Sequence, residues 1–475
     1  MGDKAFGRIY TKFYKHDGVE DRTGNNFGDD WETVRSGFRV DSQINNNNKL
    51  LIEGDFFTTK IDQIYDHPIL NYPYYSIVED RTKTSGWNIL GRYNKTFSPS
   101  SELTIHGYYD YLDLDLSFIG LELKNFDLDL QYSFILNQKH HFICGFGYRY
   151  SADQYSNTTL MSFHPDNQND DLYSAFIQDK ITLIEDLLWL TLGSKYEHND
   201  YSGSEFQPNG RLFWNISPTH KLWTAISRAV RTPSRMEQSI RLFNNIIPPF
   251  TPGLNPYDFP VPIYLLGNDV YDSEDVITYE LGYRFMPIAN LSLDMTTFLN
   301  DYKDIRTGRI RQTSIMIFTN ELDCTSYGFE LAAKWEATEW WQWDLAYSYL
   351  HFDFDFNDQV QFAGQSLDQI ASSTSPKNQI SIRSFIKLTK NLDLNLWGRY
   401  TDQVKAITLR KISQVEIDHY FTLDINLIFR PWDNIEISII GQNLLENSHP
   451  EYVQEIFTVN TEIERSVYGK VTWQF

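Results

Sequence analysis

The 475-residue sequence predicts an all-β protein, a transmembrane antiparallel up-and-down β-barrel with about 20 strands. Three observations support this fold class. Apolar and polar residues alternate with period two along much of the chain, short and long connections alternate between these segments, and aromatic residues make up 16% of the composition. Strands with one apolar and one polar face produce the first pattern. Hairpins with tight turns at one end and loops at the other produce the second.

The alternation is clearest in the C-terminal half of the chain. Segments 277–285, 392–400, 421–429 and 435–442 each place mainly Ile, Leu, Phe, Tyr or Gly on one side and mainly Asp, Asn, Glu, Thr, Ser or Arg on the other. The last segment, VYGKVTWQF, places on one face Val467, Gly469, Val471, Trp473 and Phe475. Segments with helical periodicity are almost absent. Because chain ends fray unless they are held, we expect the last strand to pair with an early strand.

The connections between these segments alternate in length. Short turns are expected near residues 41–48, 95–101, 135–140, 184–187, 215–220, 286–290, 336–340, 388–391 and 430–434. Longer connections are expected at 15–30, 58–82, 112–119, 152–171, 199–205, 231–273, 302–322, 353–375, 403–416 and 446–461. These connections imply about 20 strands, each long enough, at roughly 9–11 residues, to cross a bilayer when tilted. One end of the barrel would carry tight turns and the other end loops, as in outer-membrane barrels.

Most tryptophans lie near the predicted short turns. These are Trp189, Trp214, Trp223, Trp335, Trp340, Trp341 and Trp432, and Trp473 lies at the chain end. Indole is favoured where one edge meets hydrocarbon and the other meets water. We therefore expect a tryptophan girdle at the interface on the short-turn side. Packing around the hairpin ends of a soluble sheet is the alternative, but it does not explain the bias toward one end.

Soluble β folds fit the pattern less well. A propeller repeats every 40 to 50 residues or so with short strands, whereas the predicted strands are long and no internal repeat is visible. In a sandwich the apolar side of each strand is hidden in a dry core. The polar side carries Asp, Glu, Asn, Gln or Arg at nearly every position, which suits the wall of a wide aqueous lumen. Residues 1–475 are therefore predicted to form a single barrel domain.

Composition excludes several functions. The net charge is −22 and the pI is about 4.9, and the absence of basic stripes argues against a nucleic-acid partner. No segment approaches the roughly 18 apolar residues of a spanning helix. Cys144 and Cys324 are interpreted as packed thiols rather than a disulfide framework. The start, MGDKAFGRIY, has neither a basic nor an apolar region, so no signal peptide is recognised.

Several segments resemble, in the same order, the β-barrel of TonB-dependent outer-membrane receptors. NGRLFWNISPTHKLWTAISRAVRTPSRMEQ (209–238) is similar to the strand pair that leads into a large surface loop. The segments SEDVITYELGYRF (273–285) and TTFLNDYKDIRTG (296–308) together resemble the next hairpin of the family. The segment TSYGFELAAKWEATEWWQWDLAYSYL (325–350) resembles the hairpin after that. The segment TLDINLIFRPWDNIEISIIGQNLLENSHPEY (422–452) resembles the family's closing segment before the terminal strand. The similarity runs from about residue 4 to residue 475.

The resemblance covers the C-terminal barrel portion of such a receptor. Full-length members carry an N-terminal plug domain and a short segment that binds the energy-coupling protein, and neither is recognised in this sequence. AFGRIYTKFYKHDG resembles sequence that follows the first barrel hairpin, so that hairpin is also without a counterpart. This fits about 20 strands where the family has 22. The final segment, with alternate apolar residues and a last Phe475, resembles the signal that the barrel-assembly machinery recognises.

The resemblance implies a receptor in the bacterial outer membrane for energy-dependent uptake of a large, scarce nutrient such as a ferric siderophore, and not an enzyme. Its implied partners are outer-membrane lipid, the barrel-assembly machinery, a nutrient ligand such as a metal chelate, and a TonB-type energy-coupling complex that acts through a plug outside this chain. No cofactor and no nucleic acid are implied. The alternatives are a passive, porin-like outer-membrane channel and a secreted soluble β-sheet enzyme.

The candidate substrate-facing residues are aromatic and lie in two predicted loops. They are Phe243, Phe250, Tyr257, Phe259 and Tyr264 in the 231–273 loop, and Tyr72, Tyr74 and Tyr75 in the 58–82 loop. Aromatic loop surfaces hold a bulky, partly apolar ligand by stacking and burial. Six prolines between residues 248 and 262 stiffen the longer loop and lower the ordering cost on binding. The alternative is that these loops pack on one another and cap the barrel.

Polar candidates are fewer. Arg228 and Arg231, in the resembled motif, face either an anionic substrate or, as we favour, the many acids of the barrel wall. The pairs Asp113 and Asp115, and Asp353 and Asp355, lie on one strand face each, where they either bind a hard cation or, as we favour, line a solvated face. Adjacent His140 and His141 point to opposite faces and so do not form a metal pair.

Overall fold

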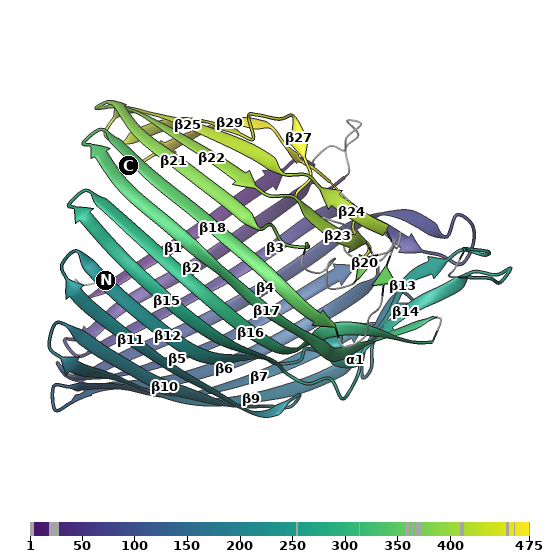
Figure 1. The fold of residues 1–475 in the computed structure, drawn as a ribbon, viewed down its shortest axis with the longest axis horizontal. Coiled ribbons are helices and arrows are strands. Elements are labelled where there is room, and N and C mark those ends of the chain that lie inside the picture. The colour runs from purple at the N-terminus through teal and green to yellow at the C-terminus, as the bar shows by residue number, and fades with distance from the viewer. Residues whose placement is uncertain are drawn as a thin grey trace.

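In the computed structural model of the chain, one large antiparallel sheet curls into a barrel with steeply tilted strands (Figure 1). The structure describes residues 4–18, 28–252, 255–312, 314–356, 361–362, 365–366, 373–408, 413–452, 456–459 and 461–474. Each strand of the wall pairs antiparallel with the next one along the chain, which is the up-and-down order. The predicted fold class is confirmed.

Twenty strands of the described chain form the wall. In order they are β1 (Ala5–His16), β2 (Trp31–Asn45), β3 (Asn48–Pro68), β4 (Tyr75–Ser98), β5 (Ser101–Leu116), β6 (Ile119–Leu136), β7 (His140–Ser156), β9 (Asn167–Ile184), β10 (Leu188–Asn199), β11 (Gly203–Ser217), β12 (His220–Arg231), β15 (Glu274–Ile288), β16 (Leu291–Gln312), β17 (Ile315–Thr338), β18 (Trp341–Phe356), β21 (Asn378–Thr389), β22 (Leu392–Thr401), β25 (Tyr420–Trp432), β26 (Ile435–Gln442) and β29 (Ser466–Trp473).

The remaining described elements belong to the long connections. They are β8 (Met161–Phe163), α1 (Arg235–Ser239), β13 (Ile240–Ile247), β14 (Val261–Leu266), and the hairpins β19 (Gln361–Phe362) with β20 (Gln365–Ser366), β23 (Val404–Thr408) with β24 (Ser413–Ile417), and β27 (Ser448–His449) with β28 (Ile463–Glu464). Within the described residues, no helix has the length and apolar character needed to cross a membrane.

The wall turns its apolar side chains outward. Ile226, Leu281 and Leu299 lie in the middle of their strands and are exposed. Their sequence neighbours Ser227 and Glu280 lie on the other face of the sheet, because side chains alternate along a strand. In a soluble sheet such large apolar residues would be covered. Apolar residues outside and polar residues inside are the arrangement of a barrel that sits in hydrocarbon.

Several long connections are shorter than the sequence predicts. In the expected 58–82 loop, β3 continues to Pro68 and β4 begins at Tyr75. In the expected 302–322 loop, β16 and β17 continue almost to the tip. The physical reason is that these strand ends leave the lipid-facing wall and are partly covered by other loops: Tyr65 near the end of β3 and Phe318 near the start of β17 are buried in a hydrophobic core. Period-two hydrophobicity therefore disappears although the backbone pairing continues.

The tryptophan girdle is correct only in part. Trp214, Trp335, Trp340, Trp432 and Trp473 are exposed near the short turns, as expected. Trp189 and Trp223 instead stack on basic side chains of the inner face. The ring of Trp189 lies 5.6 Å from the Nζ atom of Lys180, and the ring of Trp223 lies 5.2 Å from the guanidinium carbon of Arg211. A tryptophan near a turn is therefore not enough to assign its side of the wall.

The expected pairing of the last strand with an early one is wrong for the described residues. β29 pairs only with β26, and β1 pairs only with β2. The outward side chains of these two edge strands are highly exposed: Val471 of β29 is 70% exposed and Ile9 of β1 is 86% exposed. An edge strand lacks the covering that a second neighbour supplies. Val467, Gly469, Val471 and Trp473 share the outward face of β29, and Phe475 lies outside the described residues.

Candidate functional site

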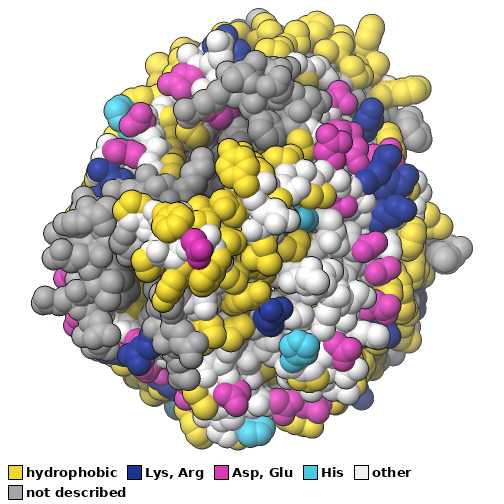
Figure 2. Space-filling model, turned by 90° about the vertical axis from the view of Figure 1, so that its right-hand side faces the viewer, with side chains coloured by type: hydrophobic (Ala, Val, Ile, Leu, Met, Phe, Trp, Pro, Cys, Tyr) yellow, Lys and Arg dark blue, Asp and Glu magenta, His cyan; other side chains and the backbone are white. Residues whose placement is uncertain are grey.

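The long connections gather at the end of the barrel opposite the short turns, on the right in Figure 1 and facing the viewer in Figure 2. A small hydrophobic core holds them together, and it consists of Tyr65, Ile119, Met161, Phe163, Ile240, Leu242, Tyr271, Phe318 and Phe457. These residues come from widely separated parts of the chain, so the loops do pack on one another. Figure 2 shows hydrophobic side chains at the centre of this loop end and acidic side chains toward its edges.

The strands β13 and β14 form a two-stranded ribbon, here called the arm. Leu242 pairs with Leu265 and Phe243 pairs with Tyr264 in the register of the arm. β13 also pairs with β8, and β14 runs parallel to the tip of β17. Leu242, on one face of the arm, is 2% exposed and belongs to the loop core. An isolated hairpin is marginal in water, so these two flanking strands and the buried face stabilise the arm.

Helix α1 links the wall strand β12 to the arm. Its N-cap is Ser234, and Glu237, three residues on, accepts a hydrogen bond from the Ser234 backbone N–H over 3.0 Å, which completes a capping box. The Glu237 side chain is 2% exposed. It also accepts hydrogen bonds from Arg231 over 3.2 Å and from Arg306 over 3.0 Å. One buried carboxylate therefore ties the helix to β12 and β16.

Burial raises the pKa of the Glu237 carboxyl, but its hydrogen bonds from Ser234 and the positive charges of Arg231 and Arg306 act in the opposite direction. The net effect lowers its pKa below the ordinary value of 4.5. Glu237 is therefore ionised at neutral pH.

A second buried contact fixes the other side of α1. Arg235 donates to Asp153 of β7 over 2.9 Å, to Gln168 of β9 over 2.6 Å and to the backbone carbonyl of Pro165 over 2.6 Å. Both Arg235 and Asp153 are less than a tenth exposed. Neither the helix α1 nor these contacts of Arg235 were predicted from the sequence. The spacing of Ser234 and Glu237 is the capping-box signal that predicts the helix, but no local pattern predicts partners this far away in the chain.

The two arginines singled out in the sequence are both ion-paired. Arg228 contacts Glu205 at 3.5 Å and Asp275 at 2.5 Å. Arg231 contacts Glu237 and Glu274, and donates to the hydroxyl of Tyr271 over 2.9 Å. Pairing with acids of the wall and loops, which we favoured, is therefore what the structure shows for both.

The aromatic candidates of the longer loop lie on the arm and near its tip. The rings of Phe243 and Tyr264 are 5.4 Å apart, and those of Tyr257 and Phe259 are stacked at 5.1 Å. Phe250, Tyr257 and Phe259 are each more than half exposed. They therefore remain available for contact with a ligand.

The second group of aromatic candidates lies in the connection between β3 and β4. The rings of Tyr72 and Tyr74 meet edge to face at 6.1 Å, and Tyr72 and Tyr75 are exposed. Among the described residues, no ring contact joins these tyrosines to the aromatics of the arm. The structure therefore brings the candidates together in two groups rather than in one.

The other candidates have ordinary surroundings. Asp113, Asp115, Asp353 and Asp355 are all exposed. His140 contacts Asp179 and His141 contacts Ser133, and the described residues contain no cluster of three or more metal-ligating side chains. Cys324 is buried and Cys144 is half-buried, and both are free thiols.

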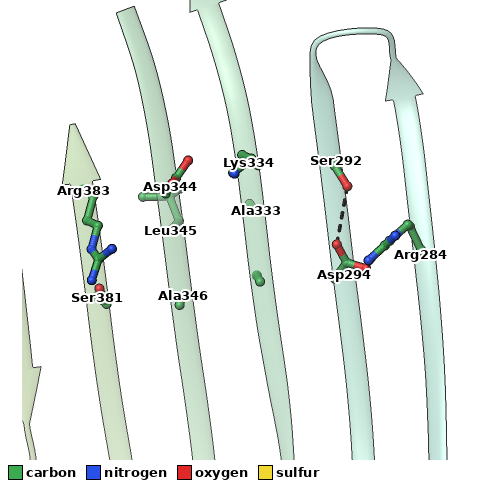
Figure 3. Close-up of a pocket in the computed structure, with 11 residues that line it drawn as sticks. Arg284, Ser292, Asp294, Ala333, Lys334, Asp344, Leu345, Ala346, Ser381 and Arg383 are labelled. Atoms are coloured by element: carbon green, nitrogen blue, oxygen red, sulfur yellow. Dashed lines mark hydrogen bonds and ion pairs between the residues drawn. The ribbon is translucent and has the colours of Figure 1, made fainter. Parts of the chain in front are cut away.

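A hollow of about 560 Å³ lies in the inner wall near the short turns (Figure 3). Its charged lining comes from adjacent strands and consists of Arg284, Asp294, Lys334, Asp344 and Arg383. Arg284 and Asp294 form an ion pair at 2.5 Å. The hollow is open and polar, far from the loop end, and so suits water or a polar surface better than an apolar ligand.

The chain is similar to known proteins in both sequence and fold. A family model described as "TonB dependent receptor-like, beta-barrel" matches residues 5–444. The chain is 26% identical over 262 residues to the iron-regulated outer membrane virulence protein of Vibrio cholerae, which covers 52% of this chain and 36% of that protein. It is 28% identical over 135 residues to the ferric enterobactin receptor of Pseudomonas aeruginosa, covering 28% of this chain and 17% of that protein.

Solved structures show the same fold. The siderophore receptor PirA from Acinetobacter baumannii superposes with a TM-score of 0.75 at 14% identity, covering 100% of this chain and 76% of that chain. The FrpB iron transporter from Neisseria meningitidis gives a TM-score of 0.75 at 11% identity, covering 100% of this chain and 78% of that chain. The chain thus spans about three quarters of these structures, and its match covers about a third of the Vibrio relative.

Proposed function

This chain belongs to the TonB-dependent receptor-like β-barrel family, and from that premise we propose that it is the barrel of an outer-membrane receptor that takes up a ferric siderophore. The relatives support iron as the cargo, because one is named iron-regulated and another is named a ferric enterobactin receptor. In this proposal the energy comes from a TonB-type complex that acts through a plug domain.

The observation that carries the proposal is the loop end. The arm is anchored through α1 to β7, β9, β12 and β16, while Phe250, Tyr257 and Phe259 near its tip stay exposed. Because the arm is held in place before the ligand arrives, its aromatic rings can bind a large ligand with little loss of conformational entropy. Beneath the loops lies a polar inner wall, along which a hydrated ligand can pass. Capture at the loops followed by passage through the lumen is therefore the mechanism that we propose.

Equilibrium binding tests this proposal directly. The purified chain in detergent is titrated with ferric siderophores of several chemical classes, and binding is followed by quenching of tryptophan fluorescence. We expect saturable binding of at least one ferric complex and weaker binding of the iron-free form. If every ferric siderophore fails to bind while the protein keeps heat-modifiable migration on a gel, the receptor function is wrong.

A passive channel is the second candidate, because the inner wall is polar along its length. Single-channel recording in a planar bilayer distinguishes the two. A steady conductance that ferric siderophores do not alter would favour the channel. A conductance that a ferric siderophore blocks from the loop side would favour the receptor, because the ligand would then occupy the mouth of the lumen.

A further inference from the structure

The two ends of the wall sheet are joined at the loop end by a contact of the last long connection. β1 and β29 each pair with one strand in the described chain, so strand pairing does not link them. Phe457 lies in the connection between β26 and β29. Its backbone carbonyl accepts a hydrogen bond over 2.9 Å from the N–H of Asp66, near the end of β3. Residues 456–459, which bring Phe457 to β3, are here called the clasp.

The pocket that receives Phe457 is aromatic. The ring of His67, on β3, lies 5.3 Å from that of Phe457, and the ring of Phe118, between β5 and β6, lies 5.2 Å from it. The ring of Tyr65 stacks beside His67 at 5.9 Å. Phe457 is almost fully buried among these rings. The clasp is therefore held by one backbone hydrogen bond and by the burial of one apolar side chain.

His67 brings an ionisable ring into this pocket. It is 7% exposed, and its Nε2 atom is buried without a hydrogen-bond partner among the residues that the structure describes. A protonated imidazole carries a proton on both ring nitrogens. The proton on Nε2 would then point into the pocket without an acceptor, and burying an unpaired charge is costly. The closed clasp therefore requires His67 to be neutral.

The charged surroundings of His67 do not compensate for a proton. Within the described residues, the charged group that favours protonation of His67 is Asp80 of β4. Its carboxylate already accepts hydrogen bonds from the backbone N–H of Ser117 over 2.8 Å and from the hydroxyl of Thr82 over 3.3 Å. Asp66 lies on the other face of β3, because side chains alternate along a strand. No carboxylate is therefore placed to bind the proton on Nε2.

Acid should destabilise the closed clasp. Burial lowers the pKa of His67 below its ordinary value of 6.5, although Asp80 acts in the opposite direction. The Tyr65 hydroxyl, the other titratable group of the pocket, donates to Gln63, and burial raises its pKa, so it stays neutral. A histidine whose pKa is lower in the closed state binds a proton more readily in the open state. The contribution of His67 is therefore complete above pH 6.5 and is lost as the pH falls below it.

We propose that the clasp is a pH-sensitive device, in which neutral His67 keeps Phe457 in its pocket and protonation of His67 releases the clasp from β3. Release breaks the contact that joins the last wall strands to the first ones at the loop end. The loop end would thus respond to the acidity of the medium. This inference goes beyond the proposed receptor function and does not depend on the identity of a ligand.

Amide hydrogen exchange of the full chain in detergent tests this inference. Protection of the Asp66 amide and of residues 456–459 is measured at about pH 7.5 and about pH 5.5, and is corrected for the intrinsic pH dependence of exchange. His67→Phe keeps an aromatic ring that cannot bind a proton, and His67→Leu is a second neutral variant. Phe457→Ala empties the pocket. The control is His198→Gln, at the exposed end of β10. Heat-modifiable migration confirms that each variant is folded.

In the parent chain we expect protection of the clasp to fall by about threefold to tenfold between the two pH values, because one group with an ordinary pKa of 6.5 supplies at most about tenfold over this range. The control should show the same fall. The neutral His67 variants should show none, and Phe457→Ala should be unprotected at both pH values. Equal protection of the parent at both pH values, or the same fall in the neutral variants, would overturn the inference. An Asp66 amide that stays protected in Phe457→Ala would overturn it as well, because Phe457 would then not hold the clasp.

Discussion

At the scale of single residues, the loop end depends on a few buried charges. Glu237 is almost fully buried, and its carboxylate is shared by Arg231, Arg306 and the N-cap Ser234. A buried carboxylate is tolerated only when it is paired and hydrogen-bonded. Glu237 meets both conditions, and its partners are the N-cap of its own helix and one arginine from each of two strands, β12 and β16. It therefore fixes the position of α1, and through α1 the position of the arm.

The first prediction concerns this carboxylate. Replacing it in Glu237→Gln leaves Arg231 and Arg306 without one shared negative charge, and we expect the arm to open locally with a loss of about 2 kcal/mol or more. Amide hydrogen exchange in residues 240–247 and 261–266 measures this opening. Exchange in the wall strand β6 should not change. The matched control is Glu336→Gln, at the exposed end of β17, and equal exchange in the two variants would contradict the prediction.

The second prediction follows from the lowered pKa of Glu237. A carboxyl whose folded pKa lies below its unfolded value binds a proton more readily when unfolded, so its contribution to stability is complete above pH 4.5 and is lost as the pH falls through the folded pKa. We expect the arm to become susceptible to pepsin as the pH falls below 4.5. The variant Glu237→Gln should show no such pH dependence at the arm. An acid transition that persists unchanged in this variant would assign it to another group.

At the scale of elements, packing across strand pairs decides which side chains fit. In the register of β12 and β15, Trp223 lies opposite Gly282. A Cβ atom at position 282 would lie 2.1 Å from the Trp223 ring, so the absent side chain makes room for the indole. The same principle governs the ends of the sheet. β1 and β29 have one described neighbour each, and they carry highly exposed large apolar side chains of the wall, among them Phe6, Ile9 and Val471.

The third prediction tests this packing. Gly282→Ala should destabilise the barrel by about 1–3 kcal/mol, because overpacking forces the indole to move. The effect should nearly vanish in a Trp223→Leu background, where the smaller side chain frees the space. Urea unfolding of the four proteins of this double-mutant cycle measures the coupling. Equal costs of Gly282→Ala in both backgrounds would show that Trp223 is not the cause.

At the scale of the whole molecule, the polarity of the barrel is inside out relative to a soluble protein. Apolar side chains cover the outside of the wall, and the clearest described hydrophobic core lies among the loops at one end. The molecule therefore has two environments for folding. The outer face of the wall contacts hydrocarbon. The loops beyond it are held together by a small hydrophobic core of the kind found in water-soluble proteins.

The fourth prediction distinguishes the two faces of the wall. Leu281→Lys places a charge on the outer face of β15, and Glu280→Lys places the same charge on the neighbouring inner face. We expect the first to cost about 2–4 kcal/mol if it lies near the bilayer midplane and the second to cost little, because the lumen is wet. Unfolding in lipid vesicles, followed by heat-modifiable migration, measures both. Equal costs would mean that the assignment of faces is wrong.

The sequence predicted the architecture better than it predicted the site. The alternation in 277–285 and 421–429 was enough to place strands and to suggest which face is apolar, because lipid selects at every second position. The ends of β3, β4, β16 and β17 were missed, since lipid no longer selects every second position there and side chains such as Tyr65 and Phe318 are buried among the loops instead. The partners of Glu237 and Arg235 were missed for another reason: Arg306 and Asp153 lie 69 and 82 residues away.

What the sequence by itself determined is therefore the strand pattern, the membrane setting and the family resemblance, because each depends on local periodicity or on ordered motifs. What only the tertiary structure decided is which loop residues meet. Arg241 and Tyr264 are separated by more than twenty positions in the sequence, and their contact exists because β13 and β14 pair in one particular register. The contacts that form the site join strands and loops far apart in the chain, so only the folded molecule defines them.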